Sequence, residues 1–279
     1  MSSSQRRSGA VGRLLMPAVL LSAASFPAAA IEPLDTFNVR IAGYISKFDT
    51  ELRADGETLR GTNVDLKRDL GLDGDSTIGL ISASWRPLEN HEFGIAYYQD
   101  SFNSSRTLNR DITFDGAVYP ASATVRSEYN LDAYELNYNW WVANNETWAL
   151  GPRLGLVWYK VELDLGLELD ANGNQGGAEF DRQVSADVPA PSIGASWRWV
   201  PADDWRIYAE AGYFTAKIND IDADVTFARG GVEWFPWESF GFMLDYTFNN
   251  IDADAEASRF DGRLEFQDSG IRLGGVYRF

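Results

Sequence analysis

The chain has 279 residues, no cysteine, a single histidine and a formal net charge of −17. Without cysteine it can form neither disulfides nor thiolate metal sites, and it has no cysteine nucleophile. Its acidity argues against nucleic acid as a partner, because no basic stripe is available to neutralise phosphates.

The first thirty residues predict a secretory signal peptide. Arg6, Arg7 and Arg13 precede the short apolar stretch LLMPAVLLSAASF, and Ala28 and Ala30 stand where a cleavage site requires small residues. The apolar stretch is too short for a membrane-spanning helix. The arginine pair also leaves a twin-arginine export route open. Cleavage after Ala30 would shift the net charge from −17 to −20, because three arginines are lost.

The rest of the chain alternates apolar and polar residues with a period of two, which is the signature of β-strands. The first segment, for example, places Val39 and Ile41 on one face and Arg40 on the other. Ten strands are predicted, although the segment 49–76 leaves eight or twelve open; they lie near 36–48, 76–86, 91–103, 125–142, 147–161, 188–200, 205–217, 224–235, 239–251 and 263–279.

Short and long connections alternate along the chain. Short turns with Pro, Asn or Asp are predicted at 86–91, 143–147, 200–205 and 235–239. Longer polar stretches are at 49–76, 104–124, 162–188, 218–223 and 252–262. Nine of the ten tryptophans lie within a few residues of a short turn, as in an interfacial girdle. A soluble sandwich has no reason to sort its loops and tryptophans in this way.

The chain ends in IRLGGVYRF, which places Ile271, Leu273, Tyr277 and Phe279 on one face. Together with the signal peptide and the alternating segments, this ending resembles a Gram-negative outer-membrane β-barrel protein, although Gly275 departs from the usual apolar residue. The resemblance covers the whole mature chain. It implies an all-β fold, a closed antiparallel transmembrane β-barrel of about ten strands, with short periplasmic turns and long extracellular loops.

The same resemblance implies a location and partners. The protein is expected in the outer membrane, in contact with membrane lipid and lipopolysaccharide. Its four C-terminal apolar residues are expected to form the signal read by the barrel-assembly machinery, and periplasmic chaperones are expected during biogenesis. No nucleic acid partner and no cofactor are expected, and the oligomeric state is left open.

The inward faces of the predicted strands carry charges of both signs. They are Arg40, Arg86, Glu92, Glu135, Arg153, Arg198, Arg206, Glu210, Arg229, Glu233, Asp245 and Arg272. One hypothesis is a narrow, porin-like passive channel for ions or small solutes, whose selectivity these charges tune. The alternative is a structural or surface-interaction barrel whose lumen is plugged by Arg–carboxylate pairs. The near balance of the two signs favours mutual pairing.

The surplus of acid falls in the long polar stretches, where IDAD occurs at 221–224 and again at 251–254. Asp-x-Asp spacing suits Ca²⁺ or Mg²⁺. The further ligands of a calcium loop are absent at their fixed offsets. A solvated acidic rim is therefore predicted, and no metal site.

An enzyme is not predicted. Known outer-membrane barrel enzymes, such as proteases of the omptin type, resemble one another in needing a histidine. This chain has only His91, in a turn placed in the periplasm, whereas omptin-type chemistry is at the extracellular end. His91 also lacks a serine nucleophile and an orienting acid at matching depth.

Overall fold

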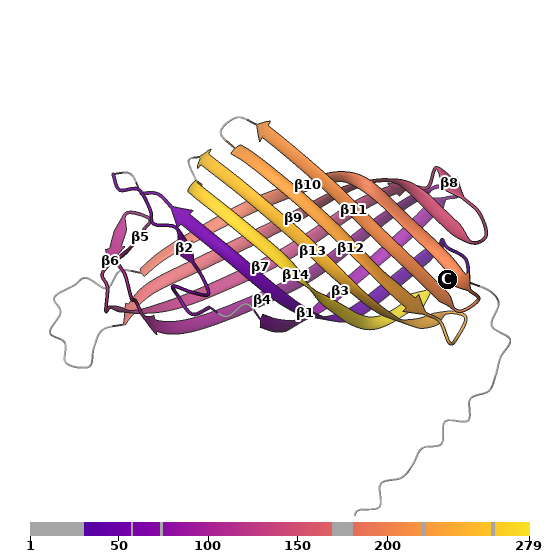
Figure 1. Cartoon of the computed structure of the whole chain (residues 1–279), viewed down its shortest axis with the longest axis horizontal. Coiled ribbons are helices and arrows are strands. Elements are labelled where there is room, and N and C mark those ends of the chain that lie inside the picture. The colour runs from indigo at the N-terminus through magenta and orange to yellow at the C-terminus, as the bar shows by residue number, and fades with distance from the viewer. Residues whose placement is uncertain (1–30, 57, 73–74, 169–180, 219–220, 258–259) are drawn as a thin grey trace, which may run out of the picture.

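The computed structural model describes residues 31–56, 58–72, 75–168, 181–218, 221–257 and 260–279, and these form an antiparallel β-barrel (Figure 1). Within these ranges no helix is long and apolar enough to cross a membrane. The barrel wall consists of ten long strands: β1 (Phe37–Ala54), β3 (Asp75–Leu88), β4 (His91–Thr107), β7 (Thr124–Trp140), β9 (Trp148–Glu168), β10 (Asp181–Ala202), β11 (Trp205–Ile218), β12 (Ile221–Trp234), β13 (Phe240–Ala257) and β14 (Phe260–Arg278).

The barrel is closed by pairing of its first and last strands. Each long strand pairs with its neighbour in chain order, and β1 pairs with β14 from Asn38↔Arg278 to Ala54↔Gly262. Closure removes the open sheet edges that a bilayer does not tolerate. The predicted fold class and the ten predicted strands are therefore confirmed.

The strands extend beyond their predicted ends on the side of the long connections. β11 and β12 continue through most of 218–223, and β13 and β14 continue through most of 252–262, where loops were predicted. The sequence there is polar on one face only. Val225, Ile251 and Phe266 are buried on the inward face, while Asp224 and Asp252 point outward. A strand with an apolar inner face and a wet outer face is stable in water.

An apolar belt surrounds the half of the barrel that lies nearer the short turns. Ile41 is 65 % exposed and Leu273 is 59 % exposed, as lipid-facing residues of a membrane barrel are. An aromatic girdle at the short-turn end consists of exposed tryptophans: Trp85, Trp140, Trp199, Trp205, Trp234 and Trp237. A second girdle consists of Tyr134, Trp158, Tyr213 and Tyr246. Trp141 is a correction to the predicted girdle, because its side chain is fully buried inside the barrel.

Two insertions cover the end of the barrel opposite the short turns (Figure 1). They contain the short strands β2 (Val64–Asp65), β5 (Ile112–Phe114) and β6 (Ala117–Tyr119). We call residues 58–72 and 108–123 the cap. Leu70, Ile112 and Phe114 are each at most 1 % exposed in it. Arg110 binds Asp69 at 2.5 Å and fastens one insertion to the other. The remaining short strand, β8 (Ala143–Asn144), lies in a turn at the opposite end.

Candidate functional site in the barrel lumen

The residues before β1 close the short-turn end, which is the periplasmic end in barrels of this type. Ile31 is 3 % exposed, and its backbone N–H donates to the Asp203 carbonyl at 2.9 Å. Leu34 packs with Trp141 and Ala149 in a small apolar cluster. The segment 31–36 therefore folds into the barrel mouth as a plug.

Asp35 anchors this plug. Both of its carboxylate oxygens accept from Arg206, at 2.7 and 2.8 Å, and Arg278 lies 3.3 Å away. Burial alone would raise the pKa of Asp35, but Arg206, Arg198 and Arg278 outweigh it and bring the pKa down to about 2. Asp35 is therefore ionised at any physiological pH and holds the plug through charge-assisted bonds.

Two further ion-pair groups lie above the plug. Arg206 also binds Glu233 at 3.0 Å, and Glu233 binds Arg40 at 2.8 Å. Arg198 makes a bidentate pair with Glu92 at 2.5 and 2.8 Å. Arg206 and Glu233 lie opposite each other on the paired strands β11 and β12. The Arg40–Glu233 and Arg198–Glu92 pairs join strands that are not neighbours, so these two pairs cross the lumen.

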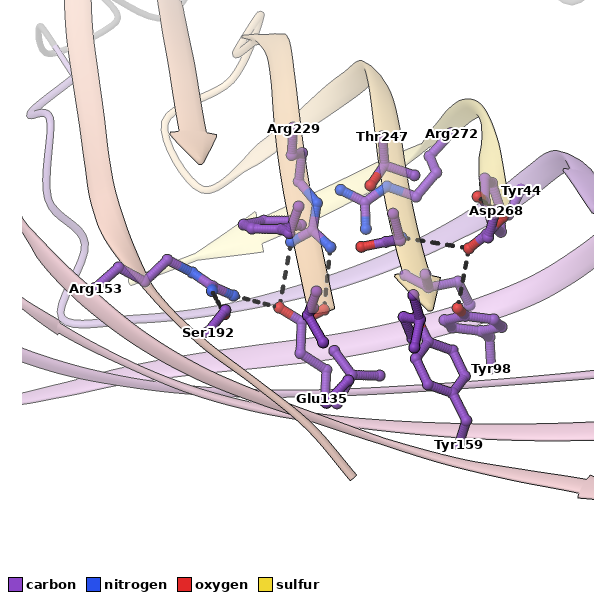
Figure 2. A pocket seen from close by; sticks show the side chains of 17 residues that line it. Tyr44, Tyr98, Glu135, Arg153, Tyr159, Ser192, Arg229, Thr247, Asp268 and Arg272 are labelled. Carbon is purple, nitrogen blue, oxygen red and sulfur yellow. Dashed lines mark hydrogen bonds and ion pairs between the residues drawn. The ribbon is translucent and has the colours of Figure 1, made fainter. Parts of the chain in front are cut away.

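The next layer is centred on Glu135 (Figure 2). Glu135 accepts from Arg153 at 2.7 Å and from Arg229 at 3.0 Å, and Arg229 also reaches Glu210 at 3.4 Å. Both guanidinium groups lie against the Phe227 ring, at 4.5 and 5.2 Å from its centroid. This arrangement pairs the charges and covers them with an aromatic face.

Asp245 and Asp268 lie in the layer beside it. Arg272 binds Asp245 through Nε and Nη2 at 2.6 and 2.8 Å, and the Tyr208 hydroxyl donates to the same carboxylate. Asp268 instead accepts from the hydroxyls of Tyr44 and Tyr98 (Figure 2).

Beyond this layer the inward face becomes apolar. The upper lumen is filled by buried side chains that pack against the cap, among them Phe48, Leu52, Leu66, Tyr129, Leu163, Leu165 and Phe266. The polarity of the lumen therefore inverts along the barrel axis, from ion pairs at the membrane to an apolar core above it.

Little free space remains among these groups. The cavity beside Asp268 and Glu135 has a volume of about 20 Å³, and the cavity beside Arg40 and Glu92 about 60 Å³. One water needs roughly 10–15 Å³, whereas a ligand pocket has about 300–1,000 Å³. The two cavities can hold a few waters and no solute.

The structure brings eleven of the twelve charges named from the sequence together in the lumen. Arg40, Glu92, Glu135, Arg153, Arg198, Arg206, Glu210, Arg229, Glu233, Asp245 and Arg272 all point inward and form the pairs above. Arg86 instead lies at the mouth, where it donates to the backbone carbonyls of Leu34, Asp35 and Glu89. Its role is to hold the plug.

Sequence reasoning missed Asp35, Tyr208 and Asp268. Asp35 precedes the first strand, so the alternation does not reach it. Asp268 shares the inward parity of Arg272 on β14, and extending the period-two count by four residues would have found it. Tyr208 follows Arg206 with the same parity. The apolar group Ile271, Leu273, Tyr277 and Phe279 does point outward, while its role as an assembly signal stays a prediction.

No protein-family model matches the chain, and no curated protein matches it. Among solved structures, it resembles the outer membrane protease OmpT from Escherichia coli, with a TM-score of 0.57 and 12 % identity over 88 % of this chain and 97 % of that one. Ail of Yersinia pestis aligns at a TM-score of 0.32 and 10 % identity, over 88 % of this chain and all of Ail. The likeness to OmpT shows the fold, an outer-membrane β-barrel, and the apolar belt supports that location.

The prediction that the chain is not an enzyme is wrong as an inference from this architecture. OmpT, whose barrel fold the chain shares, is a protease, so an outer-membrane barrel of this fold can be an enzyme. The lack of a histidine at the extracellular end is therefore not sufficient to exclude an enzyme. His91 itself lies at the start of β4, where its Nδ1 is 2.7 Å from the Tyr138 hydroxyl and its ring stacks on Trp140.

Proposed function

We propose that the protein is a closed outer-membrane barrel that acts through its extracellular surface and does not conduct solutes. The observation that carries this proposal is the filled lumen. Between the plug at residues 31–36 and the cap, the cavities found among the described side chains have volumes of about 60, 20 and 10 Å³. The channel hypothesis remains a prediction, and the packing favours the surface-interaction alternative.

The extracellular strands suggest the chemistry of the partner. Five carboxylates stand directly opposite one another in a row across five neighbouring strands: Asp224, Asp252, Glu265, Glu51 and Asp65. Like charges directly opposite each other on a sheet are destabilising. Arg263 contacts two members of the row, Asp252 at 2.9 Å and Glu265 at 2.8 Å, and Arg68 contacts a third, Asp65, at 3.4 Å.

A cationic protein or peptide surface would relieve this repulsion, so we propose a basic partner for the row. Below it, the apolar belt would contact outer-membrane lipid and lipopolysaccharide. The proposed activity is therefore adhesion or docking at the cell surface, with the ion-paired lumen serving as a rigid support.

Conductance tests the closed lumen. The folded protein in a planar bilayer is expected to stay electrically silent, and so is Arg198→Ala. That variant should instead lose about 3–5 kcal/mol of unfolding free energy, because it leaves Glu92 buried and unpaired. Arg263→Ala, at a half-buried arginine on the outer face, should cost at most about 1 kcal/mol. Reproducible conductance steps that change in Arg198→Ala would establish the channel instead.

Binding tests the acidic row. The protein in lipid nanodiscs is expected to bind a lysine-rich peptide at low salt, and the double variant Asp252→Asn/Glu265→Gln should bind it severalfold more weakly. Glu162→Gln, an exposed carboxylate on β9 outside the row, is the matched control. Equal loss in the control would show general charge attraction and count against the row.

A further inference from the structure

Asp268 is a buried carboxyl at the level where the lumen changes from ion pairs to apolar packing. Its side chain is 0 % exposed. Three neutral groups contact it from other strands: the Tyr44 hydroxyl on β1, the Tyr98 hydroxyl on β4 at 3.1 Å, and the Asn249 amide on β13 at 3.4 Å (Figure 2). Tyr159 on β9 lines the same small cavity.

Asp268 differs from the other buried carboxylates in lacking a cation. Among the described residues, each of the others forms an ion pair with arginine: Asp35, Asp69, Glu92, Glu135, Glu233 and Asp245. Arg272 lines the cavity next to Asp268, but its Nε and Nη2 both bind Asp245. Within the residues that the structure describes, no ion pair joins Arg272 to Asp268.

The other charged groups around the cavity are occupied with each other. Glu135 on β7 lies between Arg153 on β9 and Arg229 on β12, at 2.7 and 3.0 Å. The remaining titratable neighbours, Tyr44, Tyr98 and Tyr159, are neutral phenols. An ionised Asp268 would be stabilised only by neutral hydrogen-bond donors and by Arg272, which is already paired with Asp245, while burial acts against the charged form.

We infer that Asp268 is a proton-binding site, which keeps its proton in the folded barrel at mildly acidic pH, where ordinary carboxyls are ionised. An isolated charge removed from water costs so much that the group neutralises instead. The tyrosine cage suits the acid form as well, because a phenol hydroxyl accepts a hydrogen bond as well as donating one. The hydrogen bonds of the Asp268 carboxyl group to Tyr44, Tyr98 and Asn249 link four strands, β14, β1, β4 and β13, across the lumen.

This site makes the stability of the barrel depend on pH in a defined direction. In the unfolded chain an aspartate titrates near pH 3.9. A carboxyl that is protonated when folded and ionised when unfolded stabilises the fold at low pH, and this stabilisation is lost as the pH rises. Over the window in which the two states differ by one proton, the unfolding constant rises up to about tenfold per pH unit.

Infrared spectroscopy and unfolding together test the site. The folded protein in D₂O at mildly acidic pH should show the C=O band of a protonated carboxylic acid that is absent from Asp268→Asn and Asp268→Ser. Two neutral variants are used so that one remains if the other fails to fold. Asp252→Asn, an exposed partner of Arg263, is the matched control and should keep the band.

Denaturant unfolding between pH 4 and 8 gives the second readout. The stability of the native protein relative to the neutral variants should fall as the pH rises, and His91 and the chain terminus cancel in this comparison. Identical infrared spectra, together with a relative stability that is flat across this range, would overturn the inference. A purely structural Asp268 would lower stability in the variants without a pH-dependent difference.

Discussion

Asp35 shows how a single carboxylate fixes the periplasmic end of the barrel. Its six-residue segment has no strand pairing of its own, so Arg206, Arg278 and Arg86 supply most of the polar contacts that hold it in the mouth. Because the arginines outweigh burial and lower its pKa to about 2, this contact responds to acid.

The sign of that response follows from linkage. A carboxyl with a folded pKa of about 2 and an unfolded pKa near 3.9 stabilises the fold above about pH 4 and loses this contribution as the pH falls toward 2. Asp35→Asn should remove about 2–3 kcal/mol at pH 6 and much less near pH 2. Unfolding midpoints over this range measure it, with the exposed Glu32→Gln as control. A pH-independent loss in Asp35→Asn would contradict the charge-based account.

The elements of the barrel differ in how far the sequence predicted them. Ten strands, their order and the inward parity of eleven charges follow from period-two alternation, because a strand exposes one face to lipid or water and the other to the lumen. The cap and the plug do not follow. Val64, Leu70 and Phe114 are buried by contacts with distant strands, and local pattern carries no signal for such contacts.

The predicted loops are longer than the observed ones for a related reason. Asp222, Asp224, Asp252 and Asp254 resemble a polar loop by composition, yet they are the wet face of strands whose inner face holds Val225 and Ile251. Composition averages the two faces, whereas the register separates them. The side chains that bind Asp69 and Asp268 could not be predicted from the sequence either, because they are distant in the chain: Arg110 in the cap binds Asp69, and Tyr98 on β4 binds Asp268.

The cap offers a test at the level of a single hairpin. Phe114 in β5 is 0 % exposed, whereas Val118 in β6 is 49 % exposed. Phe114→Ala should destabilise the cap by about 3–5 kcal/mol, since it leaves a cavity in the upper core. Val118→Ala should change stability by at most about 0.5 kcal/mol. Hydrogen exchange of the amides in 58–72 and 108–123 measures both, and equal protection in the two variants would show that the cap does not depend on this packing.

For the whole molecule, the seam between β1 and β14 decides closure. A Cβ atom on Gly274 would lie 2.2 Å from the Ile41 carbonyl oxygen, so the two strands approach as closely as they do only with glycine there. Gly274→Ala should cost about 1–3 kcal/mol and lower the yield of folded barrel. Gly79→Ala, where a Cβ meets nothing within 4 Å, should fold normally. The heat-dependent shift in gel mobility of folded barrels reports the yield, and equal yields would refute the role of the seam.

The inversion of lumen polarity along the axis has a consequence for register. Sliding a strand by one residue moves every side chain to the opposite face. In β14, such a slip would turn Arg272 toward hydrocarbon and, in the same step, Phe266 toward water. In β9, it would do the same to Arg153 and Leu163. A one-residue slip is therefore unfavourable at both ends of the strand. It would expose a charge to lipid at one end and an apolar side chain to water at the other.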